Sequence, residues 1–177
     1  MKFKPRFLAF WALSFCLSGT VGAQNLVDAS DWKESEVPSP PAFGLSKLVI
    51  FEVASSSSLV YGVDPASIRI THSDGVVRYV MVATSASGAR NVMYEGLRCS
   101  TGEFKTYARY SADGHWSAVS LPEWRSLFGN MPSRHALRFA QAGGCDNATA
   151  PSSVKVLVSR LKNRTLRLPN KSHFQPR

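Results

Sequence analysis

The chain has 177 residues, 44% of them apolar and 19% charged, and a formal net charge of +9. This composition excludes a disordered chain and is typical of one globular domain. Removing the three cations of the leader leaves +6, and seven cations with no acidic residue follow Asp146. The body of the protein is therefore close to neutral, and only its C-terminal end favours an anionic partner.

Residues 1–23 have the pattern of a secretory signal peptide. Three cationic residues precede an apolar run over residues 7–17, and Val21-Gly22-Ala23 places small side chains where a signal peptidase cleaves. The run is shorter than the roughly 20 apolar residues that a membrane-spanning helix needs. We predict export, with cleavage after Ala23.

The cysteines divide between the leader and the domain. A lipid anchor at Cys16 would require a small residue before it, and Phe15 stands there, so cleavage after Ala23 is favoured over lipidation. Export then leaves Cys99 and Cys145, and an oxidising compartment favours one disulfide over two free buried thiols. Closing such a loop contributes roughly 4 kcal/mol through the unfolded state.

The mature chain begins with a Pro-rich arm over residues 24–46, which is expected to be extended. Trp32 and Phe43 are expected to anchor it to the body, and ligand stacking on Trp32 is the less favoured alternative. A globular domain over residues 47–162 follows.

Strand-length segments with β-branched or alternating residues fill the first half of this domain. They lie at residues 47–53, 59–63, 67–71, 76–83, 91–98, 103–110 and 115–116. The segment 76–83 is apolar on both faces, which predicts a central strand covered on both sides. Short loops join the segments, so the strands are expected to be antiparallel.

Three helices are expected in the second half. They are Leu121–Phe128, Arg134–Ala142 with Ser133 as its cap, and a helix capped by Ser152 or Ser153. The last carries an apolar stripe at positions 154, 157, 158 and 161. We therefore predict one α+β domain, an antiparallel sheet of about five to seven strands with two or three packed helices. Residues 163–177 form a polar, basic tail for which we predict disorder.

Two charged residues fall inside a central strand. Glu95 and Arg98 are three apart, so strand alternation places them on opposite faces and they cannot pair directly. Arg78 or Arg109 on a neighbouring strand is the expected partner of Glu95. A structural ion pair is the favoured interpretation, and a functional carboxylate is the alternative.

Motifs for nucleotide binding, redox or metal chemistry are absent from the sequence, and no cofactor or metal is expected. One catalytic arrangement is conceivable: Asp113 and His115 at a strand end beside Glu95. Aromatic residues of the strands could form a stacking platform, but core packing is favoured and nucleic acid is not expected as a partner. They are Tyr79, Tyr94, Phe104, Tyr107 and Tyr110.

A set of motifs over about residues 31–161 resembles the cryptic neisserial protein (CNP-like) family of exported β-proteobacterial proteins. The motifs include Trp32-x-Glu34, Asp74-Gly75-Val76-Val77-Arg78-Tyr79, Ser87-Gly88-Ala89-x-Asn91-Val92, Tyr94-Glu95-Gly96-x-Arg98-Cys99, Tyr107-Ala108, Asp113-Gly114-x-Trp116 and Trp124. The resemblance implies a small periplasmic or lipid-anchored domain, and it assigns no catalytic residue.

Together these observations predict a non-catalytic periplasmic module of the cell envelope. Its expected partner is an anionic envelope polymer, lipid headgroups or another envelope protein. The cations that would bind it are Lys155, Arg160, Lys162, Arg164, Arg167 and Lys171. The alternative is a weak hydrolase that uses Glu95, Asp113 and His115.

Overall fold

The computed structural model describes residues 31–54 and 56–165. The described residues from Trp32 onward belong to one compact unit. The expected signal peptide, the start of the arm and residues 166–177 lie outside the described residues.

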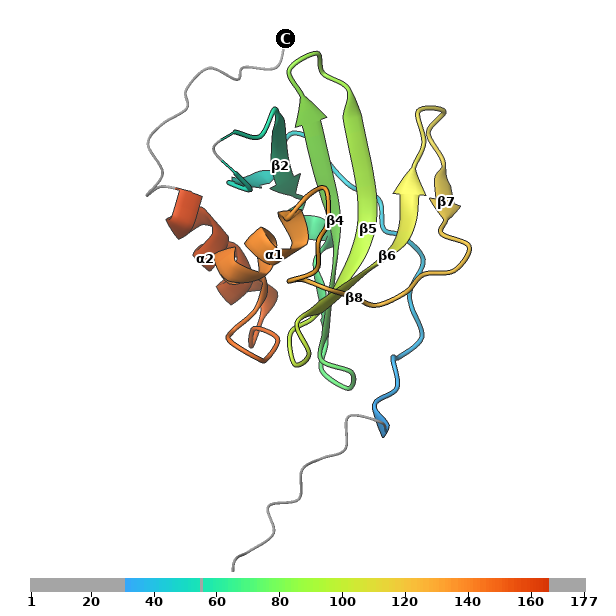
Figure 1. Ribbon diagram of the computed structural model, residues 1–177, viewed down its shortest axis with the longest axis vertical. Coiled ribbons are helices and arrows are strands. Elements are labelled where there is room, and N and C mark those ends of the chain that lie inside the picture. The colour runs from blue at the N-terminus through green and yellow to red at the C-terminus, as the bar shows by residue number, and fades with distance from the viewer. Residues whose placement is uncertain (1–30, 55, 166–177) are drawn as a thin grey trace, which may run out of the picture. The chain divides into compact units, whose positions relative to one another are not determined.

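An eight-stranded antiparallel sheet is the centre of this unit (Figure 1). Its strands are β1 (Val49–Phe51), β2 (Leu59–Val63), β3 (Arg69–Thr71), β4 (Val76–Ser85), β5 (Arg90–Arg98), β6 (Glu103–Tyr110), β7 (Trp116–Ala118) and β8 (Arg125–Ser126). The order is β1-β2-β4-β5-β6-β7, with β3 beside β4 and β8 beside β6. A short 3-10 turn, η2 (Pro65–Ser67), separates β2 from β3.

The helices pack on one face of the sheet (Figure 1). They are α1 (His135–Phe139), its π-helical continuation η3 (Ala140–Gly144), and α2 (Val154–Thr165). Ser153 starts α2, because its hydroxyl accepts a hydrogen bond from Val156 N. Leu157 and Leu161 of the predicted stripe are fully buried. The α+β class is therefore confirmed.

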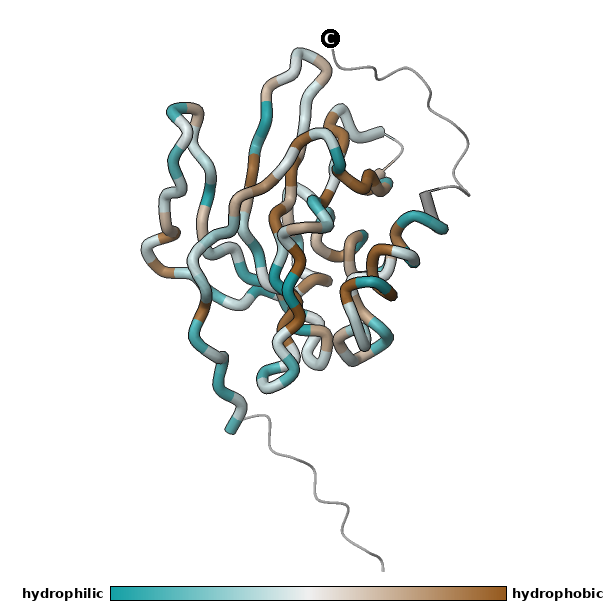
Figure 2. Tube along the Cα trace, turned by 180° about the vertical axis from the view of Figure 1, so that it is seen from behind, coloured by the Kyte–Doolittle hydropathy of each residue, from teal (hydrophilic) through white to brown (hydrophobic). Residues whose placement is uncertain are grey.

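Strand β4 is covered on both faces, as its composition predicts. Alternate residues such as Tyr79 and Met81 pack against the helices, while Val80 and Val82 pack with Phe43 of the arm and Trp116 of β7. Figure 2 shows hydrophobic residues along the central strands. Two apolar layers, one on each face, therefore hold the sheet.

The helix predicted over Leu121–Phe128 is wrong. This segment holds β8, whose two residues pair with β6, and Leu127 N donates to Gly102 O at 2.9 Å. Of its large apolar side chains only Leu127 is buried, whereas Leu121 is 81% and Phe128 70% exposed. A helix here would have no continuous apolar face to bury, so the backbone instead pairs with the free edge of β6. This segment also supplies the eighth strand, one more than predicted.

Glycine is required where α2 approaches the end of η3. Gly143 has φ +138°, and a Cβ on it would lie 2.7 Å from the Cβ of Arg160. The glycine therefore permits both the left-handed turn and the close contact. The next residue but one, Cys145, is bonded to Cys99 at the turn after β5, with a Cα–Cα distance of 5.7 Å. The predicted disulfide is confirmed.

Candidate functional site

A cluster of charged and aromatic residues joins the N-terminal arm to the second face of the sheet. We call it the arm site. It comprises Trp32 and Glu34 of the arm, Asp74 before β4, Arg78 of β4, Arg98 of β5, Lys105 and Tyr107 of β6, and Trp124 before β8.

Arg78 is the centre of the arm site. Strand alternation turns its side chain away from the helices, and it is 0% exposed. Its Nη2 lies 2.8 Å from Asp74 Oδ2 and 3.3 Å from Glu34 Oε1, and its Nη1 donates to Thr71 Oγ1 at 2.9 Å. A buried guanidinium needs paired carboxylates of this kind, because desolvation otherwise makes the charge costly.

The arm supplies the second carboxylate. Glu34 accepts hydrogen bonds from Lys105 Nζ and from the Tyr107 hydroxyl, both at 2.5 Å. Tyr107 reaches it by lying over Gly96 of β5, where a Cβ would come 2.2 Å from the tyrosine oxygen. Gly96 is thus required for this arrangement, and Glu34 bridges two strands of the sheet.

Trp32, two residues before Glu34, is held by a cation, by a second aromatic ring and by a hydrogen bond. The Arg98 guanidinium lies 3.7 Å from the ring centroid of Trp32, whose indole N–H donates to Asp74 O at 2.9 Å. Trp124 meets Trp32 edge-on at 5.7 Å, and Lys105 Nζ lies 4.9 Å from the Trp124 ring. At these distances the negative face of each indole ring attracts the neighbouring cation, Arg98 or Lys105. The predicted anchoring role of Trp32 is confirmed.

The electrostatics of the site favour charged pairs. Burial opposes ionisation of Glu34, but hydrogen bonds from Lys105 and Tyr107 outweigh it and lower the pKa of that carboxyl. Burial likewise opposes ionisation of Asp74, and Arg78 outweighs it, so the pKa of Asp74 is also lowered. Burial and the Glu34 hydrogen bond raise the pKa of Tyr107, which therefore stays a neutral donor. The site is held by ion pairs rather than by a group poised to exchange protons.

Glu95 belongs to a different cluster, on the helix face of the sheet. It is 0% exposed, and its two oxygens lie 2.9 and 3.1 Å from Nε2 of His135 in α1. Thr106 Oγ1 donates to it at 3.3 Å. The expected pairing of Glu95 with Arg78 or Arg109 is therefore corrected: Arg78 points to the opposite face, and a histidine 40 residues along the chain takes its place.

The His135 ring contacts Ser133 and Tyr61 in addition to Glu95. Its Nδ1 lies 3.1 Å from the Ser133 hydroxyl, and the Tyr61 ring stacks parallel to it at 5.8 Å. Ser133 also accepts from His135 N at 3.3 Å, but Arg134 occupies the N-cap position of α1, so Ser133 lies one residue before the cap predicted for it. The serine–histidine–glutamate row is thus part of the packing between α1 and the sheet, and sequence spacing offers no signal for it.

The Glu95–His135 pair is expected to make stability depend on pH. Burial lowers the pKa of His135, and Arg109 also lowers it, but the charge of Glu95 outweighs both and raises it. A raised folded-state pKa contributes stability that is fully present below about pH 6.5 and lost as the pH rises through the folded pKa. We expect the wild type to lose more unfolding free energy between pH 6 and pH 9 than Glu95→Gln/His135→Gln, in which neither group titrates.

Urea unfolding at a series of pH values measures this difference. The exposed His72 provides the matched control, since His72→Gln removes a histidine without touching the pair. Parallel pH profiles for the wild type and the double variant would contradict the assignment.

The residues of the predicted hydrolase are not brought together. Asp113 and His115 lie in the exposed β6–β7 turn, 3.8 Å apart, with side chains 75% and 79% exposed. Glu95 contacts His135 and Thr106 instead. No group of three His, Cys, Asp or Glu within the described segments could hold a metal ion.

Part of the predicted basic patch can be placed. Lys155 and Lys162 are exposed on α2, whereas Arg160 Nη2 pairs with Asp146 Oδ2 at 3.0 Å. Arg167 and Lys171 lie outside the described residues, as does the side chain of Arg164. No described helix is long and apolar enough to cross a membrane.

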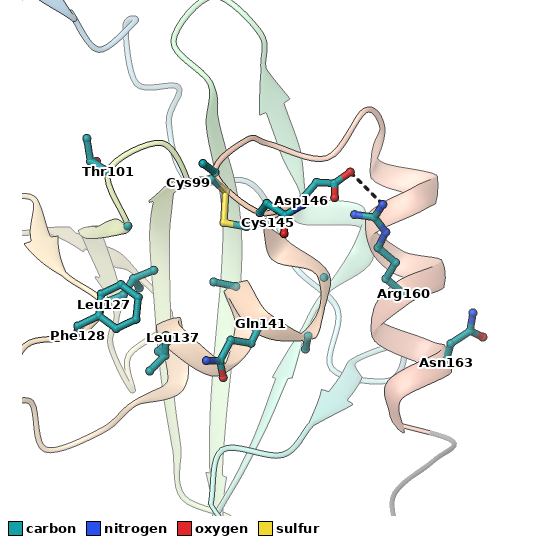
Figure 3. A pocket seen from close by; sticks show the side chains of 16 residues that line it. Cys99, Thr101, Leu127, Phe128, Leu137, Gln141, Cys145, Asp146, Arg160 and Asn163 are labelled. Atoms are coloured by element: carbon teal, nitrogen blue, oxygen red, sulfur yellow. Dashed lines mark hydrogen bonds and ion pairs between the residues drawn. A yellow bond between two sulfur atoms is a disulfide. The ribbon is translucent and has the colours of Figure 1, made fainter. Parts of the chain in front are cut away.

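An open cavity of about 800 Å³ lies beside the disulfide. Figure 3 shows the Cys99–Cys145 bond and the Arg160–Asp146 pair at its edge. Its lining mixes apolar and polar side chains, among them Phe128, Leu137, Gln141 and Asn163. The two charged residues on its wall are paired with each other, so the cavity offers surface rather than acid–base chemistry.

These features define a small α+β domain in which an antiparallel sheet holds an N-terminal arm through an internal charge cluster. The model of the CNP1-like family matches residues 27–162, and the chain belongs to this family. The match confirms the resemblance drawn from the motifs. No curated protein and no solved structure shows significant similarity to the chain.

Proposed function

We propose that the protein is an exported, non-catalytic module of the periplasmic envelope that binds an anionic partner through its basic C-terminal end. One observation carries the proposal: α2 buries Leu157 and Leu161 and presents Lys155 and Lys162 to solvent. These two cations belong to a C-terminal region that has no acidic residue after Asp146. Such a concentration of one charge attracts anionic polymers and lipid headgroups.

The assignment as a binding module rather than an enzyme is supported by how the charged groups are used. In the described part of the chain the buried carboxylates Asp74 and Glu95 and the half-buried Glu34 are each bonded to a cationic or histidine side chain, and the buried Asp64 accepts from backbone N–H groups. The pattern of residues 1–23 supports export. The cavity beside the disulfide offers further surface for a partner, without supplying its identity.

Binding to heparin and to anionic phospholipid vesicles is expected to depend on the end of the chain. A chain ending at Lys162 loses four of the seven cations that follow Asp146. We expect its affinity to fall at least about ten-fold at low salt, since each cation near an anionic surface contributes on the order of 1 kcal/mol. Binding by the full chain should weaken steeply as salt is raised.

Two further variants test whether charge is the cause. Changing Arg164, Arg167, Lys171 and Arg177 to Gln keeps the length and is expected to reproduce the loss. Changing the exposed Lys33 and Lys47 to Gln removes cations elsewhere and should have little effect. Equal binding by the full chain and the chain ending at Lys162 would contradict the proposal.

A further inference from the structure

The arm is attached to the sheet in the manner of a bound peptide. No backbone-to-backbone hydrogen bond joins described arm residues 32–46 to any strand. Each contact uses at least one side chain: Ser35 N donates to Asp74 Oδ2 at 3.0 Å, and Gly44 N donates to Asp64 Oδ2 at 2.9 Å. An extended segment held in this way is recognised through its side chains.

The surface beneath the arm is built to receive a carboxylate. Lys105 and the Tyr107 hydroxyl both donate to Glu34, and Arg78 approaches it from the floor. Asp74 also pairs with Arg78 and belongs to the floor, so the floor would keep this one ion pair without the arm. Lys105, in contrast, has Glu34 as its carboxylate partner in the described structure. Without the arm, its ammonium group would be available to bind another anion.

Two buried donors around the site are unused. The Nε atoms of Arg78 and Arg98 are buried and have no hydrogen-bond partner among the described residues. The Arg98 guanidinium also lies over the Trp32 ring, 3.7 Å from its centroid, so the same side chain holds the aromatic residue of the arm. Unpaired buried donors are uncommon, and these two leave the site with more capacity for acceptors than the arm fills.

We propose that the floor of the arm site is a peptide-binding site that takes an extended segment with an aromatic side chain two residues before a carboxylate. The arm, through Trp32 and Glu34, is its ligand within the chain. Arg98 and Trp124 bind the aromatic ring, and Lys105, Tyr107 and Arg78 bind the carboxylate. A partner that presents the same two side chains at the same spacing exchanges with the arm.

The experiment keeps the whole chain and cuts it at one point. A protease recognition sequence is inserted between Leu45 and Ser46, which are both exposed, in the full-length protein. After cleavage, size exclusion and mass spectrometry show whether the arm stays bound. A fluorescein-labelled synthetic peptide of residues 31–43 is then added, and its exchange with the bound arm is followed by anisotropy.

The cut protein is expected to keep its arm at micromolar concentration and to exchange it for the labelled peptide within a day. Peptides with Trp32→Ala or Glu34→Gln should bind at least about ten-fold more weakly. The matched control is Glu36→Gln, which removes the same charge from an exposed residue outside the site and should bind within about two-fold of the wild-type peptide.

A change in the floor separates specific recognition from general charge attraction. Lys105→Gln in the cut protein should weaken the wild-type peptide and leave the affinity of the Glu34→Gln peptide nearly unchanged, because the two variants remove the same contact. Three results would overturn the proposal: no exchange, equal binding of the Glu34→Gln and Glu36→Gln peptides, or loss of the near-ultraviolet circular dichroism of the body when the arm leaves.

Discussion

An Arg78→Ala variant is expected to lose about 3–5 kcal/mol of unfolding free energy, because removing one member of a buried ion pair leaves the other charge uncompensated. Arg78 is fully buried, and its guanidinium bonds to Asp74 at 2.8 Å and to Glu34 at 3.3 Å. The alanine would leave the buried Asp74 carboxylate without its cation. It would also remove part of the attachment of the arm.

Urea unfolding of paired variants measures this effect. Arg90 lies at the start of β5 with an exposed side chain, so Arg90→Ala is the matched control and should change stability by no more than about 0.5 kcal/mol. An Arg78→Met/Asp74→Asn variant should be more stable than Arg78→Ala, since it leaves no unpaired charge at position 74. Equal losses for the alanine variants at positions 78 and 90 would show that the cluster does not stabilise the fold.

The strands could be predicted because their side chains obey the two-residue period. Segments 59–63 and 103–110 match β2 and β6 in both bounds, and the two-faced apolarity of 76–83 correctly marks β4 as covered on both sides. The same period correctly separates Glu95 from Arg98: one bonds to His135 under α1, and the other lies over Trp32 on the opposite face. Local alternation is sufficient for such conclusions.

Local signals were insufficient where tertiary pairing decides the structure. Leu121-Pro122-Glu123-Trp124 has the residues of a helix start, yet Arg125 and Ser126 pair with β6 and form β8. The free edge of β6 stabilises an extended backbone there. The local sequence pattern carries no information about which strand edge lies nearby. The π-helical turns of η3 were likewise missed, because Gly143 adopts its positive φ in contact with α2.

Partners distant in sequence were the least predictable part of the candidate site. Glu34 meets Lys105 across 71 residues, and Glu95 meets His135 across 40. The motifs that carry the family resemblance contain several residues of the arm site, including Trp32, Glu34 and Arg78. The fold brings them together on one face. The motifs therefore contained every component of the arm site except Lys105, without indicating that these residues share one site.

Loss of the disulfide is expected to lower the unfolding free energy by about 4 kcal/mol, because the unfolded chain is released from a loop closed by residues 46 apart. The bond joins the turn after β5 to the residue that follows η3. Cys99 is buried, so the variant should replace both cysteines by serine and leave no free thiol. Urea unfolding of the oxidised wild type and of Cys99→Ser/Cys145→Ser measures the difference.

Reductant provides the matched control for that prediction. It should lower the stability of the wild type toward that of the double variant and have no effect on the variant, which holds no disulfide. The intact mass of the wild type should rise by about 2 Da on reduction, one proton and electron for each sulfur. The loop closed by the disulfide contains the segments that form β6, β7, β8 and α1. In the unfolded chain the bond therefore limits how far the two ends of this loop can separate. Equal stability of the oxidised wild type and the double variant would contradict the prediction, because the bond would then not stabilise the folded state relative to the unfolded chain.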